Sequence, residues 1–181
     1  MALKDSPNGY SGLSIILHWI TAVAVITLWI IAELAEDLPK AEAREWMGIH
    51  ISIAMSVYLI LWFRIFWRIG IKRPAAEPQH RVLNWLATWV PVVLLAGIAT
   101  MLLSGPLLIW STGNGINVFD VFTIPSPIGE SHDLHEAMEE VHEFGATLLY
   151  FGVLLHVLGA AKHLVVDRDG TVKKMLVPGN R

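Results

Sequence analysis

Long apolar segments alternate with short polar ones along this chain. Apolar side chains dominate four stretches, which are residues 13–35, 46–69, 82–110 and 141–166. A helix needs about 20 apolar residues to cross the hydrocarbon core of a bilayer, and each stretch is long enough. The pattern therefore predicts an all-α fold, a four-helix transmembrane bundle formed by one membrane domain over residues 1–181. No positive segment precedes the first stretch, so we interpret it as a retained span rather than a cleaved signal peptide.

The connections between the spans are polar and contain helix-breaking residues. Leu38 and Pro39 interrupt an acidic run between the first two spans, and prolines occur again between residues 73 and 80. The longest connection, residues 111–140, contains Gly113, Gly115, Pro125 and Pro127. Ser131 is a typical N-cap residue, so the fourth helix is expected to begin there, before its apolar part.

The basic residues predict the orientation in the membrane. All 13 Lys and Arg except Lys40 and Arg44 fall at the termini, in the connection between spans two and three, or at the span ends beside them. Because basic residues remain on the cytoplasmic side, we expect both termini to be cytoplasmic. The opposite side is acidic, with Glu33, Glu36, Asp37, Glu42, Glu45, Asp120, Glu130, Asp133, Glu136, Glu139, Glu140 and Glu143.

The composition excludes several classes of function and of metal site. Only 16% of the residues are charged, against about 25% in soluble domains, and 54% are hydrophobic. The formal net charge is −3, which gives no basic excess for binding nucleic acid. Cysteine is absent, which excludes disulfides, iron–sulfur clusters and covalently attached haem. Metal chemistry would therefore depend on histidine and carboxylate.

Four histidines inside the predicted spans form a geometric pattern. His142 and His156 are 14 residues apart, so on one helix they share a face about 21 Å apart in depth. His18 lies near the cytoplasmic end of span one, and His50 lies near the outer end of span two. Antiparallel packing then places His18 level with His156 and His50 level with His142. Ionisable groups inside a membrane are costly and usually functional.

Two imidazoles facing each other across a planar metal macrocycle would explain each pair. Imidazole is a good ligand for iron, and ligation from both sides favours electron transfer over oxygen activation. We therefore predict two b haems, with His18, His50, His142 and His156 as iron ligands. The rival hypothesis is a haem-free proton-coupled transporter that uses the same histidines as a relay.

Other residues could support this site. Arg64 lies 14 residues after His50 and could bind a propionate of the cytoplasmic-side haem, whereas Arg68 is expected to extend toward the interface. Gly145, Gly152 and Gly159 recur every seven residues, which is compatible with room for haem and with close helix packing.

Three further histidines have weaker interpretations. His163 lies seven residues after His156 and could exchange protons with a quinone, although an interfacial histidine is the plainer interpretation. His132 and His135 could bind a divalent ion, but a solvated acidic helix start is the preferred interpretation.

The motifs together resemble the bacterial cytochrome b561 family. The matching segments are SIILHW (14–19), MGIH (47–50) with Arg64 and Arg68 downstream, LSG (103–105), FTIPSP (122–127), HE (142–143) followed by His156, KH (162–163) and DGT (169–171). The resemblance covers nearly the whole chain. It implies a four-helix protein of the bacterial cytoplasmic (inner) membrane, and it maps the two haems onto the same four histidines.

The resemblance also implies a function. Members of this family exchange electrons with membrane quinone, and one branch is a superoxide:quinone oxidoreductase that oxidises superoxide outside and reduces ubiquinone. The expected interactions are therefore with membrane lipid, quinone and a periplasmic donor, either superoxide or a redox protein. The alternative is a membrane-anchor cytochrome that passes electrons between a partner hydrogenase or dehydrogenase and quinone.

This chain departs from the family at two places. It has TWVP at residues 88–91, where many members carry a histidine, and its outer loops are acidic and would repel an anion such as superoxide.

Overall fold

A computed structural model describes residues 4–7, 9–72, 74, 77 and 79–179. Its main elements are four long helices: α1 (Gly12–Glu36), α2 (Lys40–Gly70), α3 (Arg81–Trp110) and α4 (His132–Lys162). All four are long and apolar enough to cross a membrane, which confirms the predicted helical bundle. Arg73 and Arg181, two of the basic residues that predict the orientation, lie outside the described residues.

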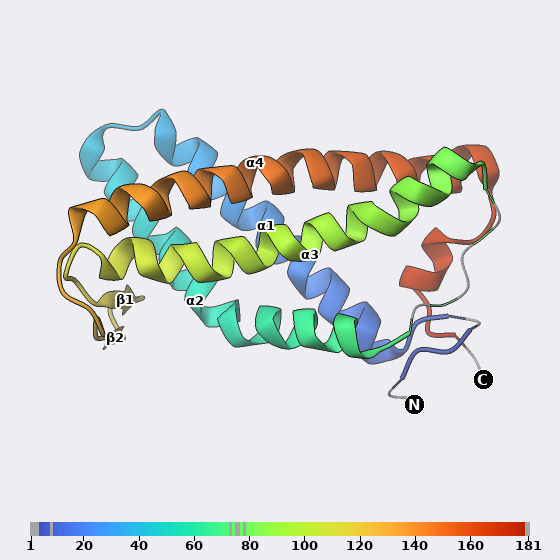
Figure 1. The fold of residues 1–181 in the computed structure, drawn as a ribbon, viewed down its shortest axis with the longest axis horizontal. Coiled ribbons are helices and arrows are strands. Elements are labelled where there is room, and N and C mark those ends of the chain that lie inside the picture. The colour runs from blue at the N-terminus through green and yellow to red at the C-terminus, as the bar shows by residue number, and fades with distance from the viewer. Residues whose placement is uncertain (1–3, 8, 73, 75–76, 78, 180–181) are drawn as a thin grey trace.

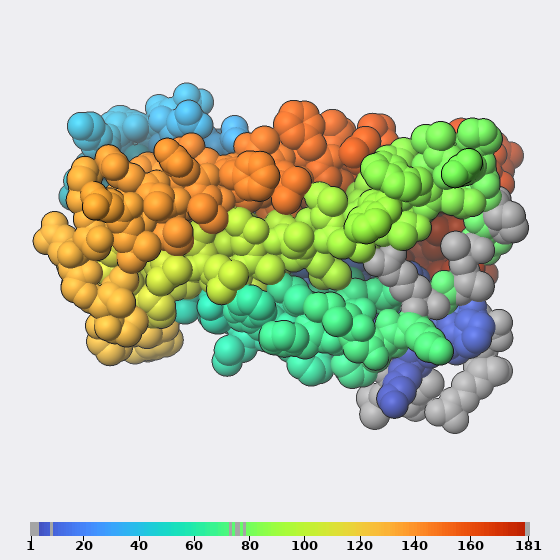
Figure 2. All heavy atoms as spheres, viewed as in Figure 1, coloured from blue at the N-terminus to red at the C-terminus, as the bar shows by residue number. Residues whose placement is uncertain are grey.

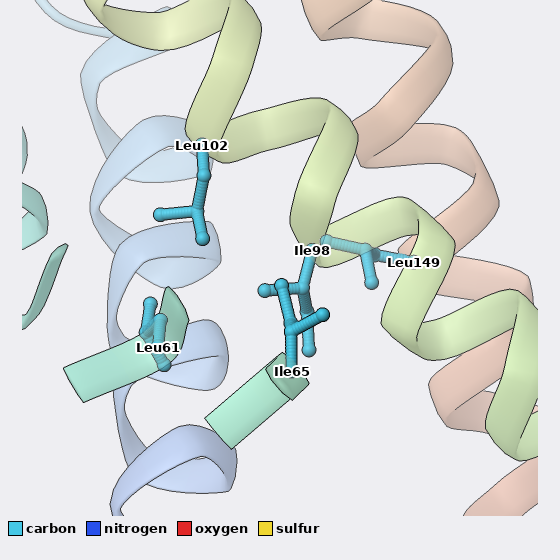
Figure 3. Packing of buried hydrophobic residues seen from close by; sticks show 5 residues of the cluster. All are labelled: Leu61, Ile65, Ile98, Leu102 and Leu149. Carbon is cyan, nitrogen blue, oxygen red and sulfur yellow. The ribbon is translucent and has the colours of Figure 1, made fainter. Parts of the chain in front are cut away.

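The helices pack mainly as two antiparallel hairpins. α1 lies against α2, and α3 lies against α4, while the α2–α3 contact is smaller. Figure 2 shows the side chains of α3 and α4 in contact along much of the bundle. A cluster of buried aliphatic residues joins the two hairpins between α2, α3 and α4 (Figure 3), and its members are Leu61, Ile65, Ile98, Leu102 and Leu149.

The two ends of the bundle differ. The first and last described segments and the α2–α3 connection lie at one end, called here the terminal end (Figure 1). The α1–α2 connection and a small antiparallel sheet lie at the other, called here the hairpin end. That sheet consists of β1 (Ile116–Val118) and β2 (Phe122–Ile124), with Asn117 opposite Thr123.

The observed helix ends refine the predictions. Ser131 is the N-cap of α4, and its hydroxyl accepts a hydrogen bond from the Leu134 amide, as its residue type predicts. α2 begins at Lys40 and therefore extends six residues beyond the apolar stretch, because its first turns are polar. The strands β1 and β2 were not predicted, because each is only three residues long.

The chain beyond α4 folds back over the terminal end. A π-helix, η1 (His163–Asp167), is followed by Arg168 in the left-handed region and by a 3-10 helix, η2 (Val172–Met175). Trp19 in α1 donates a hydrogen bond to the carbonyl of Met175 at 2.9 Å. The Gly179 amide donates to the Tyr10 carbonyl at 3.0 Å, so the two terminal segments close this end together.

Candidate functional site

The structure brings His18 of α1 and His156 of α4 together near the terminal end. Their ring centroids are 6.0 Å apart. Imidazole–metal bonds are about 2 Å long, so two imidazoles on opposite sides of one metal ion hold their centroids roughly 6 Å apart. Both residues are half-buried. Their spacing is therefore compatible with one iron between them.

His50 of α2 and His142 of α4 lie within electrostatic range of each other, toward the hairpin end. The Nδ1 atom of His50 is 3.0 Å from the carbonyl oxygen of Leu28 in α1. Since a carbonyl can only accept, Nδ1 carries the proton in this contact. The free nitrogen of His50 is then Nε2, the arrangement usual for a histidine that binds a metal.

His142 is oriented in a similar way by Ser104. The Ser104 hydroxyl donates to the Thr100 carbonyl at 2.8 Å, and its oxygen lies 2.9 Å from His142 Nδ1. Ser104 is therefore the acceptor for His142, which leaves Nε2 of His142 free. The neighbouring Gly105 lies directly against the ring, since a Cβ there would be in ordinary van der Waals contact with Cε1 of His142, at 3.5 Å. These contacts of His50 and His142 fit an iron-binding pair.

Arg64 and Arg68 lie one helical turn apart on α2, at the terminal end. Arg64 is half-buried and within electrostatic range of His18, so it suits the propionate of a haem bound there. The prediction for Arg68 is wrong. Its side chain does not extend into water, because the guanidinium pairs with Asp5 at 3.1 Å and only 9% of the side chain is exposed.

The α4 glycines divide into two groups. A Cβ at Gly145 would lie 2.8 Å from Sδ of Met101, and one at Gly152 would lie 2.9 Å from Leu94. Both glycines therefore allow close packing against α3. Gly159 has open space around its Cα and makes no such contact.

His163 follows α4 and lies beside two carboxylates. Its Nδ1 atom is 2.6 Å from Asp169 Oδ2 and 3.3 Å from Asp167 Oδ2. Desolvation alone would raise the pKa of the Asp169 carboxyl, but the Thr171 amide and His163 lower it from 3.8 to about 2. Asp169 is thus ionised at neutral pH and accepts a hydrogen bond from the Nδ1–H group of His163.

Two further histidines, His132 and His135, lie in the first turns of α4. His132 pairs with Glu136 on the exposed first turns of α4. His135 Nδ1 lies 3.0 Å from the Leu108 carbonyl and 3.1 Å from the Ser111 hydroxyl. These contacts tie the start of α4 to the end of α3.

The chain also matches a known protein family along most of its length. The family model described as prokaryotic cytochrome b561 matches residues 9–178. The chain belongs to this family. Membership implies transmembrane electron transfer, b-type haem and a multi-pass location in the bacterial inner membrane, which the four spanning helices support.

Curated relatives are similar at modest identity. Cytochrome b561 homolog 2 of Escherichia coli (strain K12) is 25% identical, covering 97% of this chain and 95% of the relative. Probable superoxide oxidase CybB of Yersinia pestis is 26% identical, covering 92% and 95%. Cytochrome b561 homolog 1 of Escherichia coli (strain K12) is 23% identical, covering 93% and 97%.

Proposed function

We propose that this single-domain membrane cytochrome transfers electrons through two b haems, one between His50 and His142 and the other between His18 and His156. The observations that carry the proposal are the approach of the His18 and His156 rings and the electrostatic proximity of His50 and His142. The spacing of 6.0 Å between the rings of His18 and His156 supports the second site. The hydrogen bonds that leave Nε2 free on His50 and His142 support the first.

Bound haem supplies one-electron redox chemistry at two positions along the membrane normal. The imidazoles of the four histidines would hold the haem irons, and ligation by two histidines would favour electron transfer over oxygen activation. Arg64 would offset the charge of a propionate at the terminal end. The apolar helices exclude water and thereby help to set the redox potentials.

The proposed donor is superoxide at the hairpin end. Two superoxide anions would each lose one electron to become dioxygen, and ubiquinone would take up the two electrons and two protons to become quinol. The choice of superoxide as the donor rests on similarity, above all to the Yersinia pestis relative named a probable superoxide oxidase. The acidic residues of the hairpin end would not attract an anion, so electrostatic steering does not support this donor.

His163 is the proposed proton-exchanging residue for ubiquinone. Its Nδ1 proton is held by Asp169, so its Nε2 atom is free to exchange a proton with a quinone carbonyl. It lies two helical turns after His156, about 10 Å along the axis. Proton uptake and electron delivery would therefore occur at the same end of the bundle.

A second candidate is a membrane-anchor cytochrome for a separate hydrogenase or dehydrogenase. The acidic hairpin end favours it, since that surface could bind a basic partner. Superoxide-driven ubiquinone reduction by the purified protein alone would support the first proposal, and an absolute requirement for a copurifying enzyme would support the second.

Single histidine variants test the proposed pairing. His50→Ala and His142→Ala should each lose one and the same haem, and His18→Ala and His156→Ala should each lose the other. The measurement is haem per chain with a reduced-minus-oxidised spectrum. His132→Ala is the matched control, because His132 lies on α4 but is exposed, and it should retain both haems.

Two results would contradict the proposal. Loss of one shared spectral component in His18→Ala and His142→Ala would refute the pairing. A folded protein without visible absorption would refute the cytochrome proposal and favour the haem-free transporter.

A further inference from the structure

A buried carboxylate lies at the terminal end, outside the proposed haem ligands. The side chain of Asp5 is 0% exposed, although it belongs to the segment that precedes α1. Removing an ionised carboxylate from water is unfavourable unless hydrogen bonds and opposite charge compensate for it. The contacts of Asp5 therefore indicate why the chain keeps it buried.

Asp5 accepts hydrogen bonds from three donors. Its Oδ1 atom accepts from the Ser11 amide at 2.9 Å and from the Ser14 hydroxyl at 2.6 Å. Its Oδ2 atom accepts from Nη1 of Arg68 at 3.1 Å. Trp67 donates to the Ser14 oxygen at 2.9 Å, which leaves the Ser14 proton for Asp5. The carboxylate is thus fixed against α1 and α2 at once.

These contacts lie directly beside the proposed inner haem site, between His18 and His156. Ser14 precedes His18 by four residues, so Asp5 lies against the face of α1 that carries His18, about one turn away. Arg68 follows Arg64 by one turn on α2, and Arg64 is within electrostatic range of both Asp5 and His18. Asp5 and the two arginines therefore act on the same small region.

The balance of charge in this cluster has a redox consequence. Two guanidinium groups and one carboxylate leave a net positive charge there. Reduction adds an electron to a haem, so nearby positive charge favours reduction and nearby negative charge opposes it. The charges of Asp5 and Arg68 are weakly screened, because these two side chains are shielded from solvent.

We infer that Asp5 is a positioning residue that holds Arg68 and lowers the midpoint potential of the inner haem. A lower potential makes that haem a stronger reductant toward quinone. The inference rests on the proposed function, because it requires a haem between His18 and His156.

The test is a redox titration of the purified holoprotein, with the inner haem identified as the component that His18→Ala loses. Asp5→Asn should shift the midpoint potential of the inner haem upward and leave that of the outer haem, between His50 and His142, unchanged. Arg68→Gln should shift the midpoint potential of the inner haem downward. In the double variant the midpoint potential of the inner haem should lie between those of the two single variants, since both charges are then removed.

Glu77→Gln is the matched control. Glu77 lies at the same end and pairs with Lys174, but its side chain is 36% exposed, so water screens its charge. It should leave both potentials unchanged.

The outcomes separate this inference from the proposed function. A protein without haem refutes the proposed function itself. A protein with two haems whose inner potential is unmoved in both single variants, or whose two potentials move equally, overturns the inference. If Asp5→Asn loses the inner haem, the test is the midpoint potential of the inner haem in Arg68→Gln. An upward shift of that potential, or no shift, overturns the inference as well.

Discussion

Ser104 is a fully buried hydroxyl that connects the backbone of α3 to His142. It is 0% exposed, and its oxygen is the hydrogen-bond acceptor for Nδ1 of His142. Such contacts to a metal-binding histidine fix the ring and increase its basicity. Ser104 is therefore expected to contribute to haem binding without touching the iron.

Ser104→Ala should weaken binding of the haem between His50 and His142 by about 10- to 100-fold, the range seen when such supporting contacts are lost. The measurement is the rate at which each haem is lost to an excess of a haem-scavenging protein. Ser56→Ala is the control, because Ser56 makes the same type of bond to the carbonyl four residues earlier but no bond to histidine. Equal haem loss in the two variants would contradict this role.

At the residue scale, sequence spacing predicted that His18 and His156 lie level with each other, because helix rise and rotation are regular, and their rings are 6.0 Å apart. It did not predict the contact between Asp5 and Arg68, which joins positions 63 residues apart. A basic residue at a span end usually extends to water, and only the fold of the first segment shows that Arg68 turns inward. The role of Ser104 was also missed, since its position in the LSG motif gives no partner.

At the scale of elements, α4 is the helix on which both proposed sites depend. It carries His142 and His156, and its glycines pack against α3. The sequence alone allows two roles for these glycines, which are close helix packing and room for haem. The contacts of Gly145 and Gly152 favour packing, which periodicity alone could not decide because both roles require a small residue on the helix surface.

Gly145→Ala should destabilise the protein by about 1–3 kcal/mol, because the added methyl would overlap Met101 and Thr100 of α3. Thermal unfolding in detergent measures the effect. Gly48→Ala is the control, since Gly48 of α2 has no atom within 4 Å of the added methyl. Alanine is also the better helix former, so the control should be neutral or more stable. Equal destabilisation in both variants would exclude the packing role.

At the scale of the whole molecule, the two ends of the bundle are proposed to face different compartments. The terminal end carries most of the basic residues, and the positive-inside rule assigns it to the cytoplasm. This assignment is independent of the haem proposal, because it depends only on loop charges.

Because the chain has no cysteine, single introduced thiols can test the orientation without a background signal. Asp120→Cys, in the connection between β1 and β2, should react with a membrane-impermeant maleimide in cells with a permeabilised outer membrane. Lys173→Cys, at the terminal end, should react only after the inner membrane is disrupted. The reverse pattern would place both termini in the periplasm.

The division of the bundle into two helical hairpins has a consequence for biogenesis. Each proposed histidine pair joins one hairpin to the other, through α1 and α4 or through α2 and α4, while most helix contacts lie within the hairpins. The nascent chain could therefore insert as two separately packed hairpins. Binding of the prosthetic groups would then hold the two hairpins together. In cells starved of porphyrin synthesis, the polypeptide should remain membrane-inserted but become a ready substrate for quality-control proteases.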